Sequence, residues 1–167
     1  MPCALRLLGL GLALALVPTA QAVTSSTFQV SASIANGCLV VGGVTAYGVL
    51  DYGTRSALAT GVVSTSLGGT TVTFQCTPGV GLSMSLDGGQ NPASGTRYLK
   101  RSGGTQLLAY QLYSDAAFSQ VLGVGSSITL SYSDPTAIKL PVFGRTTLPG
   151  NLPAGTYTDV VQVTVTW

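Results

Sequence analysis

The stretch that decides the fold is "AGTYTDVVQVTVTW", residues 154–167. Large apolar side chains alternate with polar ones along it. One face carries Tyr157, Val161, Val163, Val165 and Trp167, and the other carries Thr158, Gln162, Thr164 and Thr166. A period of two is typical of a β-strand with one buried face. No turn and no returning strand follow this segment in the sequence, so we expect one edge of the strand to need a partner from elsewhere.

The first 22 residues predict a secretory signal peptide. Arg6 precedes an apolar run over Leu7–Val17, and Ala20-Gln21-Ala22 has the small-x-small pattern of a cleavage site. The apolar run is about 11 residues long, whereas a membrane-spanning helix needs about 20. We therefore expect an exported mature chain, Val23–Trp167, of one domain's length and without a membrane span.

Cleavage after residue 22 removes Cys3 and leaves Cys38 and Cys76. An even number of cysteines in an exported protein indicates a disulfide. A zinc site is disfavoured, because the sequence has no CxxC spacing and no histidine to complete the ligand set. The sequence thus predicts a Cys38–Cys76 disulfide and no metal.

The composition narrows the class of protein. Charged residues make up only 7% of the chain, and its net charge is +2, of which one unit belongs to Arg6 in the leader. A nucleic-acid-binding protein would need a basic patch, and a disordered chain would not be 46% hydrophobic. A surface of such low charge fits a protein that packs against copies of itself better than a solitary soluble one.

The residue types needed for catalysis are scarce. The sequence has no histidine, so a triad hydrolase lacks its base. The aspartates lie mostly in turn-like contexts, where Asp side chains bind their own backbone; they are Asp51, Asp87, Asp115, Asp134 and Asp159. The basic cluster of Arg97, Lys100 and Arg101 is interpreted as a solvated loop. We predict a protein that is not an enzyme and needs no cofactor.

Segments rich in Val, Thr and Tyr alternate with Gly and Pro turn pairs, a pattern that predicts an all-β sandwich. The expected strands are Thr27–Ala35, Leu39–Val49, Val62–Ser66, Thr70–Cys76, Gly81–Leu86, Gln106–Tyr113, Ser127–Ser131, Ala137–Phe143 and Thr156–Trp167.

The leading strand allows two interpretations. Its apolar face is Phe28, Val30, Ala32 and Ile34, and little precedes it to hold it in place. It either pairs with the last strand of the same molecule and closes the sandwich, or it fills the groove beside the last strand of another copy. The second arrangement is β-augmentation, in which backbone hydrogen bonds bind and alternate side chains enter pockets.

Several motifs of this chain recur in the same order in the spore coat protein U domain family, which includes the pilins of archaic chaperone–usher pili. They are "TFQVSASIANGC" (27–38), "VLDYG" (49–53), "FQC" (74–76), "LAYQLYSD" (108–115), "VFGR" (142–145) and the stretch 154–167. The chain resembles this family over essentially all of Val23–Trp167. It departs at Tyr52, where the family usually has Phe.

The resemblance implies an incomplete immunoglobulin-like sandwich that lacks its seventh strand and is completed by donor-strand complementation. A periplasmic chaperone lends a strand, and an outer-membrane usher exchanges it for the N-terminal segment of the next copy or of a related pilin. Residues 1–22 are then the signal peptide, 23–36 the donor segment and 37–167 the sandwich. The function implied is that of a surface pilus subunit that supports adhesion and biofilm formation.

The same resemblance assigns roles to residues. Phe28, Val30, Ala32 and Ile34 match the donor-strand pocket residues, and Cys38 and Cys76 match the disulfide of the fold. Ala32 is smaller than is usual in the family, which predicts a weaker joint or a shallower pocket. The acceptor groove and the chaperone anchor, which is the carboxylate of Trp167, are expected at Tyr157, Val161, Val163, Val165 and Trp167.

Two other functions stay open at this point. One is a spore or cell-surface coat protein that polymerises without forming a pilus. The other is a secreted sugar-binding module that stacks tyrosines on sugars, although tyrosines in strands are more often core or cross-strand residues. The tyrosines concerned are Tyr47, Tyr52, Tyr98, Tyr110, Tyr113 and Tyr132.

Overall fold

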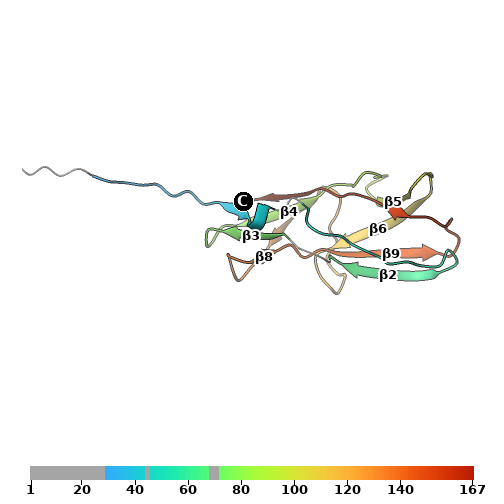
Figure 1. Cartoon of the computed structure of the whole chain (residues 1–167). Coiled ribbons are helices and arrows are strands. Elements are labelled where there is room, and N and C mark those ends of the chain that lie inside the picture. The colour runs from blue at the N-terminus through green and yellow to red at the C-terminus, as the bar shows by residue number, and fades with distance from the viewer. Residues whose placement is uncertain (1–28, 44–45, 68–71) are drawn as a thin grey trace, which may run out of the picture. The chain divides into compact units, whose positions relative to one another are not determined.

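The computed structural model describes residues 29–43, 46–67 and 72–167, which fold as an all-β protein (Figure 1). In these ranges the helical element is a short 3-10 turn, η1 (Val41–Gly43). The strands are β1 (Cys38–Val40), β2 (Thr60–Ser66), β3 (Thr73–Cys76), β4 (Leu82–Leu86), β5 (Arg97–Arg101), β6 (Leu107–Tyr113), β7 (Ser127–Leu130), β8 (Ile138–Lys139), β9 (Phe143–Pro149), β10 (Tyr157–Thr158) and β11 (Val163–Thr166).

The strands form one five-stranded sheet, in the order β10-β5-β6-β9-β2, and two three-stranded sheets, β11-β4-β7 and β1-β3-β8. The antiparallel β2–β9 ladder runs from Thr60 opposite Pro149 to Ser66 opposite Phe143. The next strands on each side, β3 and β8, form a second antiparallel ladder. Between the two ladders Leu67 donates its N–H to the carbonyl of Val142 at 3.0 Å. The segment between β8 and β9 therefore passes from the β1-β3-β8 sheet to the five-stranded sheet.

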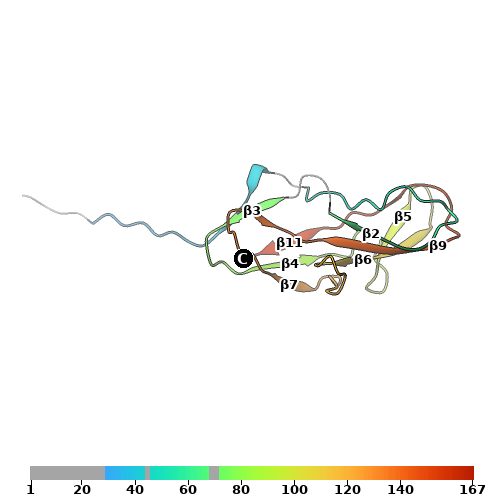
Figure 2. The same cartoon turned by 90° about the horizontal axis from the view of Figure 1, so that it is seen from below.

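The core forms because strands of all three sheets bury alternate side chains. In β4 the buried residues Leu82, Met84 and Leu86 alternate with two half-buried serines. β4 lies between β11 and β7 in its sheet, as Figure 2 shows. The other sheets contribute to the same core; its buried members are Val72, Phe74, Cys76, Val80, Leu82, Met84, Leu86, Tyr110, Leu112, Leu122, Leu130, Ile138, Leu140 and Val142.

The predicted disulfide is confirmed. Cys38 lies opposite Cys76 in the β1–β3 register, and their sulfur atoms are bonded. Closing a loop of this size stabilises a fold by about 4 kcal/mol in the chain-entropy description. The bond ties the first strand of the sandwich to the buried strand β3.

Most strand predictions are confirmed. Strands β2, β4, β6 and β7 match four predicted segments to within two residues at each end. The prediction over Thr70–Cys76 is confirmed over Thr73–Cys76. The predicted final strand exists as two pieces, β10 and β11, with residues 159–162 between them.

Three strand predictions are wrong in part or whole. The segment Ala137–Phe143 is not one strand, because β8 ends at Lys139 and β9 begins at Phe143; Pro141 lies in the gap and has no N–H for a ladder. Leu39–Val49 is a strand only as far as Val40, after which the chain turns through η1. The part of Thr27–Ala35 that the structure describes belongs to no strand.

Strand β5 was not predicted, and the interpretation of its basic cluster as a solvated loop is wrong. Arg97 begins the strand and is only 3% exposed, whereas Lys100 is exposed. Residues Arg97–Lys100 pair with β6. The sequence did not indicate this strand, because the burial of the Arg97 side chain depends on acceptors that are distant in the sequence.

The predicted turn role of the aspartates is confirmed at four positions. Each carboxylate accepts a backbone N–H from two to five residues further on; the donors are Gly53 to Asp51, Gly89 to Asp87, Ser119 and Gln120 to Asp115, and Thr136 to Asp134. The N–H of Gln120 is the main cause that lowers the pKa of the Asp115 carboxyl. Asp159 has a different role, described below.

Candidate strand-binding groove

The segment quoted first, residues 154–167, has the predicted burial pattern at its valines but not at Trp167, which is exposed. Val161, Val163 and Val165 are half-buried and pack against the core, while Thr164 and Thr166 are exposed. β11 pairs on one side with β4. Among the described residues no strand pairs with its other side, so β11 is an edge strand.

The link between β10 and β11 is held by side chains instead of a strand ladder. Asp159 accepts hydrogen bonds from the hydroxyl of Tyr110 at 2.5 Å and from the N–H of Gln90 at 2.7 Å. Asp87 accepts the N–H of Gln162 at 2.9 Å through its side chain and donates its own N–H to the carbonyl of Gln162 at 3.0 Å. These bonds fix the course of the chain where it passes the groove described next.

A groove lies beside the last strand and encloses a cavity of about 340 Å³. Residues 47–50 form one wall and residues 159–163 the other. The remaining lining is almost wholly apolar and belongs to the core; it consists of Tyr52, Leu67, Leu86, Leu99, Tyr110, Leu112, Leu140 and Val142. The groove thus lies over the core of the sandwich, between the first and last parts of the folded domain, and the core residues of its floor, such as Leu86 and Leu112, are themselves buried.

A second cavity, of about 710 Å³, adjoins the first. Residues 49–57 and 152–159 line it together with side chains of the five-stranded sheet, among them Val63, Leu108 and Leu148. The two cavities share lining residues, namely Val49, Leu50, Tyr52, Leu99 and Asp159. They therefore form one groove that follows the last segment of the chain from residue 152 to residue 163.

Tyr52 lies where the two cavities meet. Its hydroxyl is buried without a hydrogen-bond partner, and a Cβ at Gly144 would lie 2.5 Å from it. Burial raises the pKa of the Tyr52 hydroxyl, and Tyr113 raises it further. Because Gly144 has no side chain, it leaves the space that the Tyr52 hydroxyl fills.

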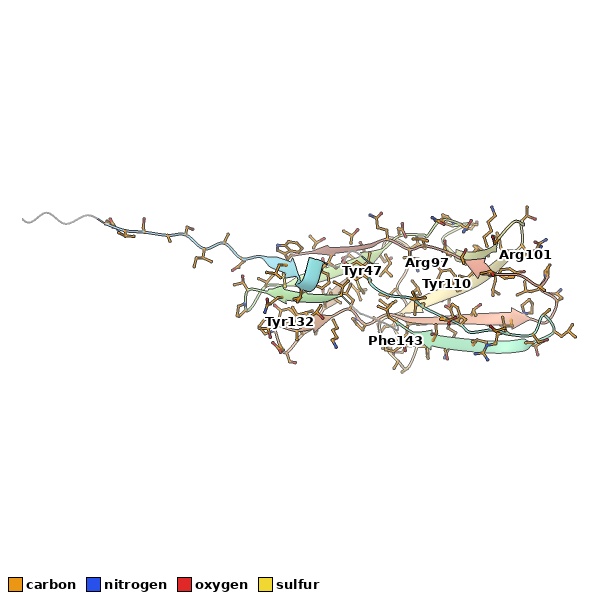
Figure 3. The ribbon with its side chains drawn as sticks, viewed as in Figure 1. Tyr47, Arg97, Arg101, Tyr110, Tyr132 and Phe143 are labelled. Carbon is orange, nitrogen blue, oxygen red and sulfur yellow. A yellow bond between two sulfur atoms is a disulfide. The ribbon has the colours of Figure 1, made fainter. Side chains whose placement is uncertain are left out.

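Arg97 lines neither cavity but bonds to the backbone of Leu86, a residue that lines the smaller one. Its guanidinium donates to the carbonyls of Asp87 and Leu122 at 2.7 Å each, and to those of Leu86 at 3.0 Å and Gly123 at 3.2 Å. Burial lowers its pKa. Figure 3 labels Arg97 and Tyr110, whose strands β5 and β6 are neighbours.

The structure brings some predicted acceptor residues to the groove and not others. Val161 and Val163 line the smaller cavity, and Tyr157 lines the larger one while its hydroxyl donates to the carbonyl of Pro153 at 2.9 Å. Val165 packs against the core beyond the cavity linings. Trp167 lines neither cavity and is 56% exposed.

The predicted donor residues are free of strand pairing in the described part of the chain. Val30 is 81% exposed and Ile34 is 90% exposed, and Ala32 is exposed as well. Phe28 lies outside the described residues. The compact unit of the fold begins at Ala35.

Sequence reasoning missed the opposite wall of the groove and its floor. Residues 47–49 were assigned to the end of a predicted strand and Leu50 to no strand, and the core residues of the floor come from six separate segments. The signal for the wall was the apolar pair Val49-Leu50 directly before the Asp51 turn, of which Leu50 is half-buried and Val49 exposed.

Two classes of site are not found in the described residues. They contain no group of three or more His, Cys, Asp or Glu side chains placed to hold a metal ion. None of the helical segments that the structure describes is long and apolar enough to cross a membrane.

The fold is thus an all-β sandwich with an unpaired edge strand beside an apolar groove. Residues 24–164 match the family described as "SCPU: Spore Coat Protein U domain". The match covers most of the chain, and the protein therefore belongs to the Spore Coat Protein U domain family.

The chain is also similar to individual proteins. "Protein U" of Myxococcus xanthus is 28% identical over 165 residues, which cover 90% of this chain and 88% of that protein. A solved structure of the CsuC–CsuE chaperone–tip adhesion subunit pre-assembly complex, from archaic chaperone–usher Csu pili of Acinetobacter baumannii, matches with a TM-score of 0.50 and 20% identity. The match covers 80% of this chain and 40% of that chain, and it confirms the predicted immunoglobulin-like fold. A chaperone–tip adhesin complex of CFA/I fimbriae has a TM-score of 0.46 and 16% identity, and the match covers 78% of this chain and 41% of that chain.

Proposed function

We propose that this protein is a structural subunit of a surface pilus that is assembled by donor-strand exchange. The observation that carries the proposal is the apolar groove beside the unpaired edge of β11. An unpaired edge strand beside an apolar groove is prone to aggregate unless another strand covers it. The proposal assigns no catalytic step and no cofactor to the protein.

The strand that fills the groove is the leading segment of another copy. Its apolar residues Val30 and Ile34 are exposed, as a segment that binds elsewhere must be. Burying one large apolar side chain contributes roughly 1.5–3 kcal/mol, so Phe28, Val30 and Ile34 together supply on the order of 5–9 kcal/mol before ordering costs. Each backbone hydrogen bond adds about 0.5–1.5 kcal/mol.

The route to the surface follows from the same need. The groove must be covered before polymerisation, so a periplasmic chaperone fills it first and an outer-membrane usher exchanges that strand for the donor segment. The likeness to subunits of chaperone–usher pili supports these partners. The mature protein is then a cell-surface polymer that supports adhesion and biofilm formation.

The test compares Val30→Asp with Gln29→Asp in cells that express the protein with a chaperone and an usher. The two substitutions add the same charge at adjacent positions of an extended segment, on opposite faces. We expect Val30→Asp to abolish surface filaments in electron micrographs and Gln29→Asp to leave them, because a charge in an apolar pocket is strongly unfavourable. Equal filament numbers in both variants would refute donor-strand exchange.

A binding measurement tests the same joint without cells. A subunit deleted for residues 23–35 is mixed with a synthetic peptide of that segment, and the thermal unfolding midpoint is recorded. We expect the peptide to bind and raise the midpoint in proportion to the logarithm of its concentration. A midpoint that the peptide does not change would favour a closed sandwich that needs no partner strand.

A coat protein is the second candidate, because the family is described as a spore coat domain and "Protein U" matches over most of both chains. A coat subunit would cover the cell surface evenly, whereas a pilus subunit would form filaments. The same electron micrographs separate the two functions.

The positions of the tyrosines do not support the sugar-binding alternative. Tyr110 and Tyr113 are buried, and Tyr47 stacks on Phe74. The hydroxyl of Tyr132 donates to the carbonyl of Val80. These side chains have packing roles and do not form an exposed stacking platform.

A further inference from the structure

A second free edge lies far from the groove in the sheet order. β2 is the last strand of the five-stranded sheet and pairs only with β9 (Figure 1). In an edge strand every second residue points its N–H and C=O groups away from its one neighbour. Among the described residues, the backbone of Thr60–Ser66 has no backbone hydrogen bond outside the β2–β9 ladder.

This edge lacks the features that usually keep edge strands apart. Natural edges are short, charged, interrupted by proline or covered by another segment. β2 has seven residues, "TGVVSTS", without a charge or a proline. Its outward-facing Val62 is 62% exposed, and a Cβ on Gly61 would meet no atom within 4 Å. By contrast β10, at the other end of the sheet, has only two residues and lies opposite Lys100 and Arg101.

We infer that β2 pairs antiparallel with β2 of a second copy, about a two-fold axis at Val63. In this register Val63 faces Val63, Val62 faces Ser64 and Thr60 faces Ser66. No like charges meet, and hydroxyl groups and valine side chains face partners of compatible size. Such a contact uses the same surface on both partners and closes after two copies, which makes it a pairwise link.

The role of the β2 contact rests on the proposed function, because the edges of β11 and β2 then bind different partners. β11 receives the donor strand along a filament, and β2 stays free on each subunit. One contact of two seven-residue strands is small, well below the roughly 1,200 Å² of stable specific interfaces, so isolated subunits associate weakly. A filament repeats the contact at every subunit, and the combined affinity exceeds that of each contact by orders of magnitude. The β2 edge therefore joins filaments side by side.

Cysteine cross-linking of the exported full-length protein tests the pairing directly. Val63→Cys places two thiols opposite each other across the two-fold axis, within the about 4.4–6.8 Å between Cα atoms that a disulfide needs. Val62→Cys is the matched control, because its thiol faces residue 64 of the partner and lies beyond that range from its own counterpart. Under mild oxidation we expect covalent dimers from Val63→Cys and monomers from Val62→Cys on non-reducing gels.

Dimers from neither variant, at normal protein levels, would overturn the β2 pairing. The result does not depend on polymerisation, since concentrated subunits meet at this edge even when no filament forms. An absence of filaments together with Val63→Cys dimers would count against the proposed function alone.

A charge at the edge tests the consequence for filaments. Ser64→Lys puts a lysine on the free edge, and Thr147→Lys puts the same charge on the exposed side of β9, one strand inward. We expect Ser64→Lys to separate bundles into single filaments without changing their number, and Thr147→Lys to leave the bundles. Bundles that persist with Ser64→Lys would contradict lateral joining through β2.

Discussion

At the scale of single residues, Arg97 has the least expected role. A charged side chain is rarely buried without an ion pair, yet the Arg97 guanidinium binds only carbonyl oxygens, those of Leu86, Asp87, Leu122 and Gly123. These carbonyls lie at strand ends and turns. Those of Leu86 and Gly123 also accept a backbone N–H, from Gly125 and Ser126, and Arg97 adds a second donor to them. Arg97 therefore acts as a substitute for backbone donors and joins the end of β4 to the segment that precedes β7.

Replacement of Arg97 by lysine tests this role. An ammonium group cannot reproduce the planar fork of donors, so carbonyls such as those of Asp87 and Leu122, whose donor is Arg97, lose their partner at about 1–3 kcal/mol each. We expect Arg97→Lys to lower the free energy of unfolding by at least about 2 kcal/mol in urea titrations. Arg101→Lys is the control, because Arg101 makes one exposed bond to the carbonyl of Ala154. Equal midpoints for the two variants would refute the role of Arg97.

At the scale of elements, we expect the two faces of the last strand to differ in their tolerance of a charged substitution. Val163 lies opposite Leu86, is half-buried and lines the groove, whereas Thr164 lies opposite Ser85 and is exposed. Both residues are in the same four-residue strand and pair with the same neighbour. A difference in stability between substitutions at these two positions is therefore caused by the face on which each residue lies, and not by the strand to which it belongs.

An aspartate on each face makes the comparison. We expect Val163→Asp to destabilise the domain by at least about 2 kcal/mol and to prevent binding of the donor peptide, because it removes apolar burial and adds an unpaired charge. We expect Thr164→Asp to change stability by less than about 0.5 kcal/mol. Urea titrations and calorimetry with the peptide measure both effects. Tight peptide binding to the Val163→Asp variant would place the donor strand elsewhere.

At the scale of the whole molecule, stability depends on buried tyrosine hydroxyls that stay neutral. Burial raises the pKa of Tyr52 and of Tyr110 above the ordinary value of 10.0. For Tyr110 the hydrogen bond to the Asp159 carboxylate raises the pKa further. A raised pKa in the folded state means that the stabilisation is complete below pH 10 and is lost as the pH rises above it.

We therefore expect the free energy of unfolding to fall steeply above pH 10, with tyrosinate absorbance of these residues appearing only as the protein unfolds. Tyr110→Phe should reduce this dependence. Tyr52→Phe should cost little at neutral pH, because the Tyr52 hydroxyl has no partner to lose. Ionisation of every tyrosine in the native protein near pH 10 would contradict the expectation.

Part of this architecture follows from the sequence by itself. The alternation over residues 154–167 predicts the inner face of the last strand, which the structure confirms at Val161, Val163 and Val165 but not at Trp167. The two cysteines outside the predicted signal peptide predict their bond, which the structure also confirms. The turn role of aspartates such as Asp115 is also predicted from the sequence. Each of these features depends on residues within a few positions of one another, or on a pair with one possible partner, so local pattern and elementary chemistry suffice.

Tertiary structure alone decided the rest. The sequence around Arg97 indicates a solvated loop, and it became the start of a buried strand because carbonyls from residues 86–87 and 122–123 converge on it. The groove has its walls at residues 47–50 and 159–163, more than a hundred positions apart. The free edge of β2 exists because β9 covers only one of its sides. Burial, grooves and edges depend on which distant segments meet, and a local pattern carries no information about that.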